Sequence, residues 1–169
     1  MASVAEHLVH QLEGAGVRHI YGIVGDSLNP VVDAVRRSKK IRWIHVRHEE
    51  TAAFAAAAEA EITGQLAVCA GSCGPGNLHL INGLYDANRS HLPVLAIASH
   101  IPTSQIGTGF FQETHPDRIF DECSVFSEMI SSSEQVPRVT RSAIQQALSN
   151  HGVAVLTLPG DIADMEVSG

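Results

Sequence analysis

The apolar positions of the chain follow two spacings in turn. In residues 3–15, Val4, Leu8 and Leu12 recur at the spacing of one helical face, whereas residues 19–25 form the short apolar run of a buried strand. Similar apolar runs predict further strands at 42–48, 65–72, 92–100, 124–131 and 152–161. The segments between them predict helices from residue 26 to about 36–40, at 51–63, from the turn at 74–76 to about 87, at 116–122 and at 133–149.

Strands that alternate with helices predict an α/β fold, a doubly wound and mostly parallel six-stranded sheet with helices on both faces. The strands are nearly continuous apolar runs, as a sheet covered on both faces requires. Such folds bind ligands beyond the carboxyl ends of their strands. The segments that matter most for function are therefore 24–27, 48–51, 71–77 and 100–116.

The chain has 169 residues, which is the usual size of one domain. We expect that domain to cover residues 1–163. The tail from residue 162 has the composition of a frayed end, and 164–169 are expected to form a disordered tail or the start of a linker. Residues 26 or 27 are expected to cap the second helix, because Asp and Ser are favoured at that position.

Composition and charge exclude several classes of binding partner. The 11 basic and 18 acidic residues give a net charge of −7, and no basic stripe is present, which argues against nucleic acid and anionic membranes. No apolar run approaches the ~20 residues of a membrane span, and the first residues lack the apolar core of a signal peptide. The three cysteines are odd in number and lack CxxC spacing, so we expect reduced, mostly structural thiols and a cytoplasmic protein.

Two adjacent acids, Glu49 and Glu50, separate a predicted strand from an alanine-rich helix. Helix starts favour acids, so both could be ordinary solvated residues, which residue type alone favours. Alternatively, a partly desolvated carboxyl group at this position could exchange a proton near neutral pH. The following helix carries only Phe54 as a large apolar side chain between residues 52 and 60. It is therefore expected to pack tightly, either at a subunit contact or inside the domain.

Two further segments could contact a ligand. The sequence GSCGPGN at 71–77 is a glycine-rich turn between strand and helix, either a plain tight turn or a backbone platform against a flat ring. The sequence GTGFFQETHP at 107–116 sets hydrogen-bonding groups beside two aromatic residues. That loop either contacts substrate, or Phe110 or Phe111 plugs the core beneath it.

The histidines do not form a recognisable metal motif. His7 and His10 are one pair and His45 and His48 another, but zinc signatures need more ligands at set spacings. On a strand, His45 and His48 would point to opposite faces. We therefore predict no metal ligands in this chain.

Six motifs in order resemble one family. They are YGIVGDSLN (21–29), RHEETAAFAA (47–56), AVCAGSCGPGNLHLINGLYDA (67–87), PVLAIASHIP (93–102), GFFQETHP (109–116) and VLTLPGD (155–161). Together they resemble the N-terminal, pyrimidine-binding domain of thiamine-diphosphate-dependent enzymes. Within that family the chain is most similar to the branch of pyruvate oxidase and pyruvate:quinone dehydrogenase.

The resemblance implies roles for individual residues. Glu49, rather than Glu50, matches the glutamate that hydrogen-bonds N1′ of the cofactor's aminopyrimidine and so helps the cofactor become a nucleophile towards pyruvate. The remaining matches with the cofactor-binding positions are Val24, Gly25, Gly74, Pro75, Gly76 and His79. Phe111 and Gln112 match the pair that faces the substrate, so Glu49, Phe111 and Gln112 are the candidate catalytic residues. Many relatives carry Asn in place of His79 and Pro in place of Val24, and both departures put acetolactate-synthase-like chemistry in doubt.

The resemblance also implies missing parts. In the family, Mg²⁺ and the diphosphate are held by a GDG…NN segment of a C-terminal domain, and FAD by a middle domain in the oxidase branch. This sequence has GDS at 25–27 and GDI at 160–162, but no GDG followed by NN. We therefore expect one domain of a longer 2-keto-acid-decarboxylating oxidoreductase, inactive alone. Its expected partners are the diphosphate-binding domain of another subunit and further copies of itself in a homo-oligomer.

Two alternatives to an excised domain remain at this stage. The chain could be a natural small subunit that pairs with a separate diphosphate-binding chain. It could also be a non-catalytic assembly module with the same fold, although Glu49 and the loop at 110–113 argue against a loss of chemistry.

Overall fold

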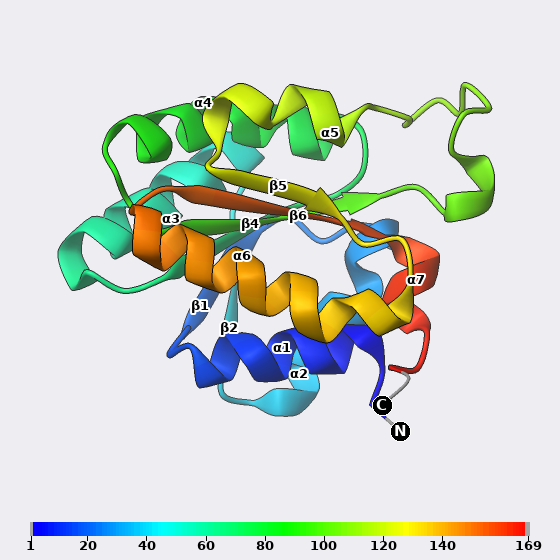
Figure 1. Ribbon diagram of the computed structural model, residues 1–169, viewed down its shortest axis with the longest axis horizontal. Coiled ribbons are helices and arrows are strands. Elements are labelled where there is room, and N and C mark those ends of the chain that lie inside the picture. The colour runs from blue at the N-terminus through cyan, green and yellow to red at the C-terminus, as the bar shows by residue number, and fades with distance from the viewer. Residues whose placement is uncertain (1, 168–169) are drawn as a thin grey trace.

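A single parallel sheet forms the centre of the molecule. The computed structural model describes residues 2–167, and within them six strands pair in the order β2-β1-β3-β4-β6-β5, all parallel (Figure 1). The strands are β1 His19–Gly22, β2 Arg42–His45, β3 Ala67–Gly71, β4 Val94–His100, β5 Phe126–Met129 and β6 Val153–Pro159. The predicted six-stranded α/β fold is confirmed.

Helices cover both faces of the sheet. They are α1 Val4–Gly14, α2 Asn29–Ser38, α3 Glu49–Thr63, α4 Pro75–Arg89, α5 Pro116–Ile119, α6 Val136–Asn150 and α7 Gly160–Asp164. One core contains α1, α2, α6 and α7, and the other contains α3, α4 and the segment after α5. Strand residues contribute alternately, with Val68 in the first core and Cys69 in the second, because successive side chains point to opposite faces.

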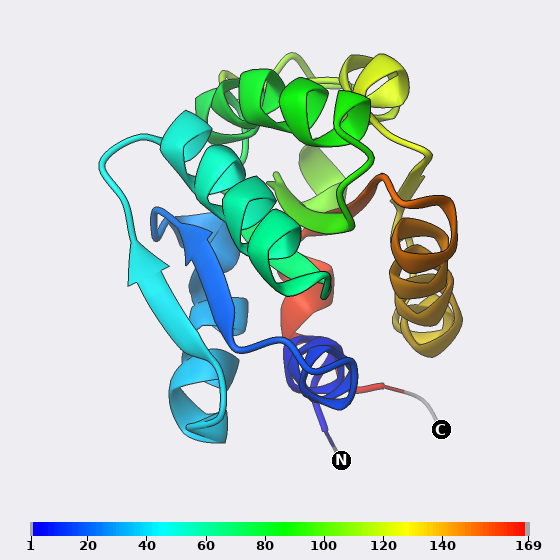
Figure 2. The ribbon, with the colours of Figure 1, turned by 90° about the vertical axis from the view of Figure 1, so that its left-hand side faces the viewer.

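The alanine-rich helix α3 lies side by side with α4 (Figure 2). The small residues on both helices permit a close approach. A Cβ atom on Gly83 would lie only 2.5 Å from the Cβ atom of Ala53 and 2.8 Å from the backbone nitrogen of Phe54. The tight packing expected of α3 is thus found within the domain, while a contact of this helix with another subunit stays a prediction.

Several boundaries differ from the predicted ones. Strands β1 and β2 end at Gly22 and His45, three residues earlier than expected, and α3 begins at Glu49, two residues earlier. The predicted capping of α2 by Asp26 or Ser27 is wrong, because both residues lie in a 3₁₀ turn at 26–28. Ser27 instead accepts a hydrogen bond from the backbone N–H of Cys73, at 3.1 Å.

The described part of the C-terminal tail is ordered by pairing with the N-terminus. Ile162 is buried in α7, Val4 N–H donates to the carbonyl of Met165 at 2.8 Å, and Val167 N–H donates to that of Ala2 at 3.0 Å. A frayed end is therefore not found in 162–167. A linker starting near residue 164 stays a prediction, and its last residues, 168–169, lie outside the described part of the chain.

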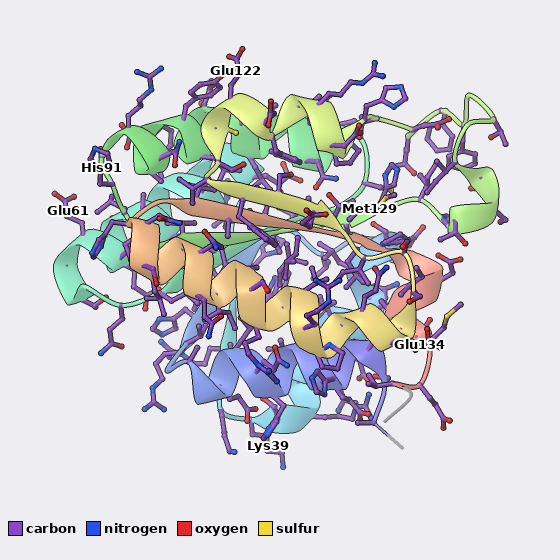
Figure 3. The ribbon with its side chains drawn as sticks, in the orientation of Figure 1. Lys39, Glu61, His91, Glu122, Met129 and Glu134 are labelled. Atoms are coloured by element: carbon purple, nitrogen blue, oxygen red, sulfur yellow. The ribbon has the colours of Figure 1, made fainter. Side chains whose placement is uncertain are left out.

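The charged surface and the buried thiols agree with the composition. Lys39, Glu61 and Glu122 point outward from the helices and connections that carry them (Figure 3).

Between residues 2 and 167 no helix combines the length and apolarity needed to cross a membrane. All three cysteines are buried and unpaired, and burial raises the pKa of the Cys69 thiol to about 12 and that of Cys123 to about 11.

Candidate functional site

The segments singled out by topology meet at the carboxyl edge of the sheet. The turn after β3, the start of α3 and the long loop between β4 and α5 all belong to this edge, and the loop projects from it (Figure 1). Parallel strands present their carboxyl ends together, so residues far apart in the sequence can contribute to one site.

Glu49 and Glu50 have different environments although they are neighbours. Glu49 is the first residue of α3 and is 8% exposed, and its Oε2 lies 3.0 Å from Nδ1 of His79. Glu50 is more exposed and accepts a hydrogen bond from Nδ2 of Asn82 at 2.7 Å. The interpretation as a solvated helix-start acid therefore fits Glu50 and does not fit Glu49.

A glycine turn borders the buried carboxylate. The Oε1 atom of Glu49 would be only 3.1 Å from a Cβ atom on Gly76, so any side chain at this position would crowd the carboxylate. Gly74 has a φ of +70°, and a Cβ atom there would lie 3.1 Å from the carbonyl oxygen of Gln112. Pro75, between them, is the first residue of α4, a position that suits proline. The glycine turn therefore lies against Glu49 at Gly76 and against Gln112 at Gly74.

Val24 and Gly25 lie on the neighbouring connection after β1. A Cβ atom on Gly25 would approach Oγ of Ser72 to a distance at which a side chain does not fit, so the two connections touch through backbone and Ser72. The side chain of Val24 is 49% exposed. An exposed apolar side chain is a suitable contact for a flat ring.

The long loop presents one aromatic ring outward. Phe111 is 83% exposed, and its ring centroid lies 4.8 Å from that of Phe110, which is partly buried. Plugging of the core by Phe111 is therefore wrong. Phe110 and Gln112 help to line a cavity of about 700 Å³ that also includes Ser27 and Cys73.

Glu113 organises this loop from within. Its carboxylate accepts hydrogen bonds from the backbone N–H groups of Gly107 and Gly109, the latter at 2.8 Å. These hydrogen bonds lower the pKa of Glu113 below its usual value, and the bond from Gly107 has the largest effect. The ionised carboxylate therefore holds the loop more strongly than the protonated acid does.

We expect the loop to loosen in acid. Because the folded-state pKa is lowered, the stabilisation is fully present above the ordinary carboxyl pKa of about 4.3 and is lost as the pH falls through the lower folded value. Amide NMR signals of Gly107 and Gly109 should move together in that range, and Glu113→Gln should produce the same signals at neutral pH. Signals that stay unchanged in the variant would show that Glu113 does not hold the loop.

A histidine pair completes the site. His48 is the N-cap residue of α3 and accepts a hydrogen bond at 3.3 Å from Glu50 N–H. Its ring stacks on His79, with the ring centroids 4.3 Å apart and the planes 27° from parallel. Potential metal-ligating atoms of His48, Glu49 and His79 all lie within 4.8 Å of one another.

His48 does not lie on a strand with His45, contrary to the prediction. Strand β2 ends at His45, and His48 is the N-cap of α3, so the two side chains do not alternate across a sheet. The signal that could have identified it is its position, because His followed by Glu-Glu and a helical run is a candidate N-cap. His100, which ends β4, is 2% exposed, and burial lowers its pKa.

The structure brings some of the predicted site residues together. Glu49 lies against both Gly76 and His79, and Gly74 lies against Gln112. Val24 and Phe111 are exposed on connections of the same edge of the sheet. The roles assigned to these residues stay predictions.

Comparison with known proteins agrees with the motifs. The family described as thiamine pyrophosphate enzyme, N-terminal TPP binding domain, matches residues 2–120. An uncharacterized 42.6 kDa protein of Pseudomonas amyloderamosa is 62% identical over 95% of this chain and 40% of its own length. Pyruvate oxidase of Lactiplantibacillus plantarum is 41% identical over 92% of this chain and 26% of its own length. Acetolactate synthase of Mycobacterium bovis is 36% identical over 94% of this chain and 26% of its own length.

The chain therefore spans less than half the length of these relatives. The family match covers more than half of the chain, and it includes the helix start that carries Glu49, the glycine turn and the aromatic loop. With the parallel sheet and the motifs in place, the chain belongs to the thiamine pyrophosphate enzymes and forms their N-terminal, thiamine-pyrophosphate-binding domain.

Proposed function

We propose that the chain supplies the pyrimidine-binding half of the active site of an enzyme that oxidatively decarboxylates pyruvate with thiamine diphosphate. The observation that carries this proposal is the burial of Glu49 at the start of α3, beside a turn whose Gly76 places no side chain against the carboxylate. A buried acceptor next to a strip without side chains fits a flat, hydrogen-bonding ring. The residues therefore fit the aminopyrimidine part of the cofactor.

Each site residue has a proposed task. Glu49 would share a proton with N1′ of the aminopyrimidine in a hydrogen bond, while His79 keeps the carboxyl group in place from 3.0 Å. Gly74, Pro75 and Gly76 present backbone to the ring, and Val24 and Gly25 border it. Bound thiamine diphosphate supplies a carbon nucleophile and an electron sink for decarboxylation. The diphosphate, Mg²⁺ and FAD are proposed to be held outside this chain, the first two by a domain of another subunit of a homo-oligomer.

Pyruvate oxidation is favoured over acetolactate synthesis within the family. Identity is 41% to a pyruvate oxidase and 36% to an acetolactate synthase, which by itself is a small difference. Val24 and His79 add to it, because both residues depart from the versions that the resemblance associates with acetolactate synthesis.

The substrate is tested by product analysis. The assembled enzyme, meaning this chain together with the diphosphate-binding domain, is supplied with pyruvate, Mg²⁺, FAD, thiamine diphosphate and an electron acceptor. We expect CO₂ release coupled to reduction of the acceptor. Acetolactate as the main product, without acceptor reduction, would overturn the oxidative assignment.

Phe111 is expected to contact the substrate. Phe111→Ala should lower kcat/KM for pyruvate roughly tenfold, since one apolar contact is worth about 1–3 kcal/mol. Its side chain is 83% exposed, so the melting temperature should hardly change. Ile106→Ala, in the same loop with a side chain 38% exposed, is the matched control and should retain normal kinetics. Equal kinetics in both variants would remove Phe111 from the site.

A further inference from the structure

We propose that His48, Glu49 and His79 form a binding site for a divalent transition-metal ion such as Zn²⁺. The candidate ligand atoms of these three residues lie within 4.8 Å of one another, and two of them, Oε2 of Glu49 and Nδ1 of His79, are 3.0 Å apart. The cluster joins the start of α3 to His79 in the second turn of α4, so two helices hold its members. This site is a second use of the region assigned above to the cofactor ring.

The types of ligand select the metal. Two imidazoles and one carboxylate are a frequent ligand set for zinc, and three protein ligands leave a fourth position for water. Imidazole suits Zn²⁺, Ni²⁺ and Cu²⁺, whereas Mg²⁺ prefers ligands that are all oxygen. The site should therefore discriminate against the Mg²⁺ that the cofactor itself requires.

The present arrangement needs only a local change to bind a metal ion. The His48 and His79 rings are stacked and do not yet point to a common centre. Their side chains are 49% and 44% exposed, so either ring can turn without disturbing the core. His48 would give up the long hydrogen bond from Glu50 N–H, and the metal ion would replace the direct contact between Glu49 Oε2 and His79 Nδ1.

A regulatory consequence rests on the proposed function. If Glu49 shares a proton with the aminopyrimidine, a metal ion on the same carboxylate would withdraw the negative charge that holds this proton. Zinc and thiamine diphosphate should then weaken each other's binding, and zinc should inhibit more strongly at low cofactor concentration.

Zinc titration of the cofactor-free chain tests the site directly. We expect calorimetry to show one zinc site that is tighter than any other zinc binding to the chain. The affinity of this site should fall at least about tenfold in His48→Gln and in His79→Gln, because even residues that contact a metal only indirectly change its affinity by about 10–100-fold. His45→Gln is the matched control, since His45 is exposed at the end of β2 and outside the cluster. Equal zinc affinity in all three variants and the original chain would overturn the proposal.

A second titration separates this inference from the proposed function. In the assembled enzyme with Mg²⁺ in excess, added thiamine diphosphate should raise the apparent Kd for zinc, and the shift should grow with cofactor concentration. An apparent Kd for zinc at His48 and His79 that does not change with cofactor concentration would overturn this coupling and place the ring elsewhere. If zinc does not bind at this site but Glu49→Gln still lowers activity as expected, the metal site alone is overturned.

Discussion

Glu49→Gln is expected to lower pyruvate turnover by the assembled enzyme by about 10²–10⁴-fold, the usual effect of removing a positioned acid or base. Glutamine has nearly the same shape and can still accept a hydrogen bond, but it cannot hold the proton that N1′ of the aminopyrimidine shares. The loss should appear in kcat at saturating cofactor, since the variant removes proton transfer more than binding.

Glu50→Gln is the matched control. Glu50 is the next residue of α3, and its hydrogen bond with Asn82 can be retained by a glutamine oxygen. Its turnover should be close to normal. If the two variants lose turnover equally, the difference in burial between the two acids has no catalytic meaning, and the proposed role of Glu49 is wrong.

Gly83→Ala is expected to lower the free energy of unfolding by about 2 kcal/mol or more, in the upper range for overpacking. The added carbon would meet Ala53 at 2.5 Å and the backbone nitrogen of Phe54 at 2.8 Å, and backbone atoms cannot move aside alone. The helices α3 and α4 must therefore separate. Urea unfolding at neutral pH measures the loss.

Gly14→Ala controls for the helical preference of alanine. Gly14 lies in α1, and a Cβ atom there would meet nothing within 4 Å. Alanine is favoured over glycine in helices by about 1 kcal/mol, so Gly14→Ala should be neutral or stabilising. If Gly83→Ala behaves like Gly14→Ala, the close contact of α3 and α4 does not contribute to stability.

The fold was predictable because its signals are local. Helical spacing in 3–15 and six apolar runs were enough to place six strands and the helices between them, and the alternation then required a parallel sheet. The ends of the elements were harder to predict. Residues 23–25 continue the first apolar run in sequence and Val46 continues the second, but the chain leaves the sheet after Gly22 and after His45.

The candidate site was only partly predictable for the same reason. The sequence identified Glu49, the glycine turn and the loop at 107–116 as candidates, and the resemblance distinguished Glu49 from Glu50. The stacking of His48 on His79 depends on the relative placement of α3 and α4, which no local pattern contains. The approach of Gly74 to Gln112 is likewise a contact between distant segments.

The most direct test of the account is the rate at which the C2 proton of bound thiamine diphosphate exchanges with D₂O in the assembled enzyme. This rate reports the proton relay that begins at the Glu49 carboxylate, without requiring substrate, flavin or electron acceptor. The account predicts that Glu49→Gln slows the exchange by about 10²-fold or more while Glu50→Gln leaves it unchanged. Equally fast exchange in Glu49→Gln and in the original enzyme would contradict it.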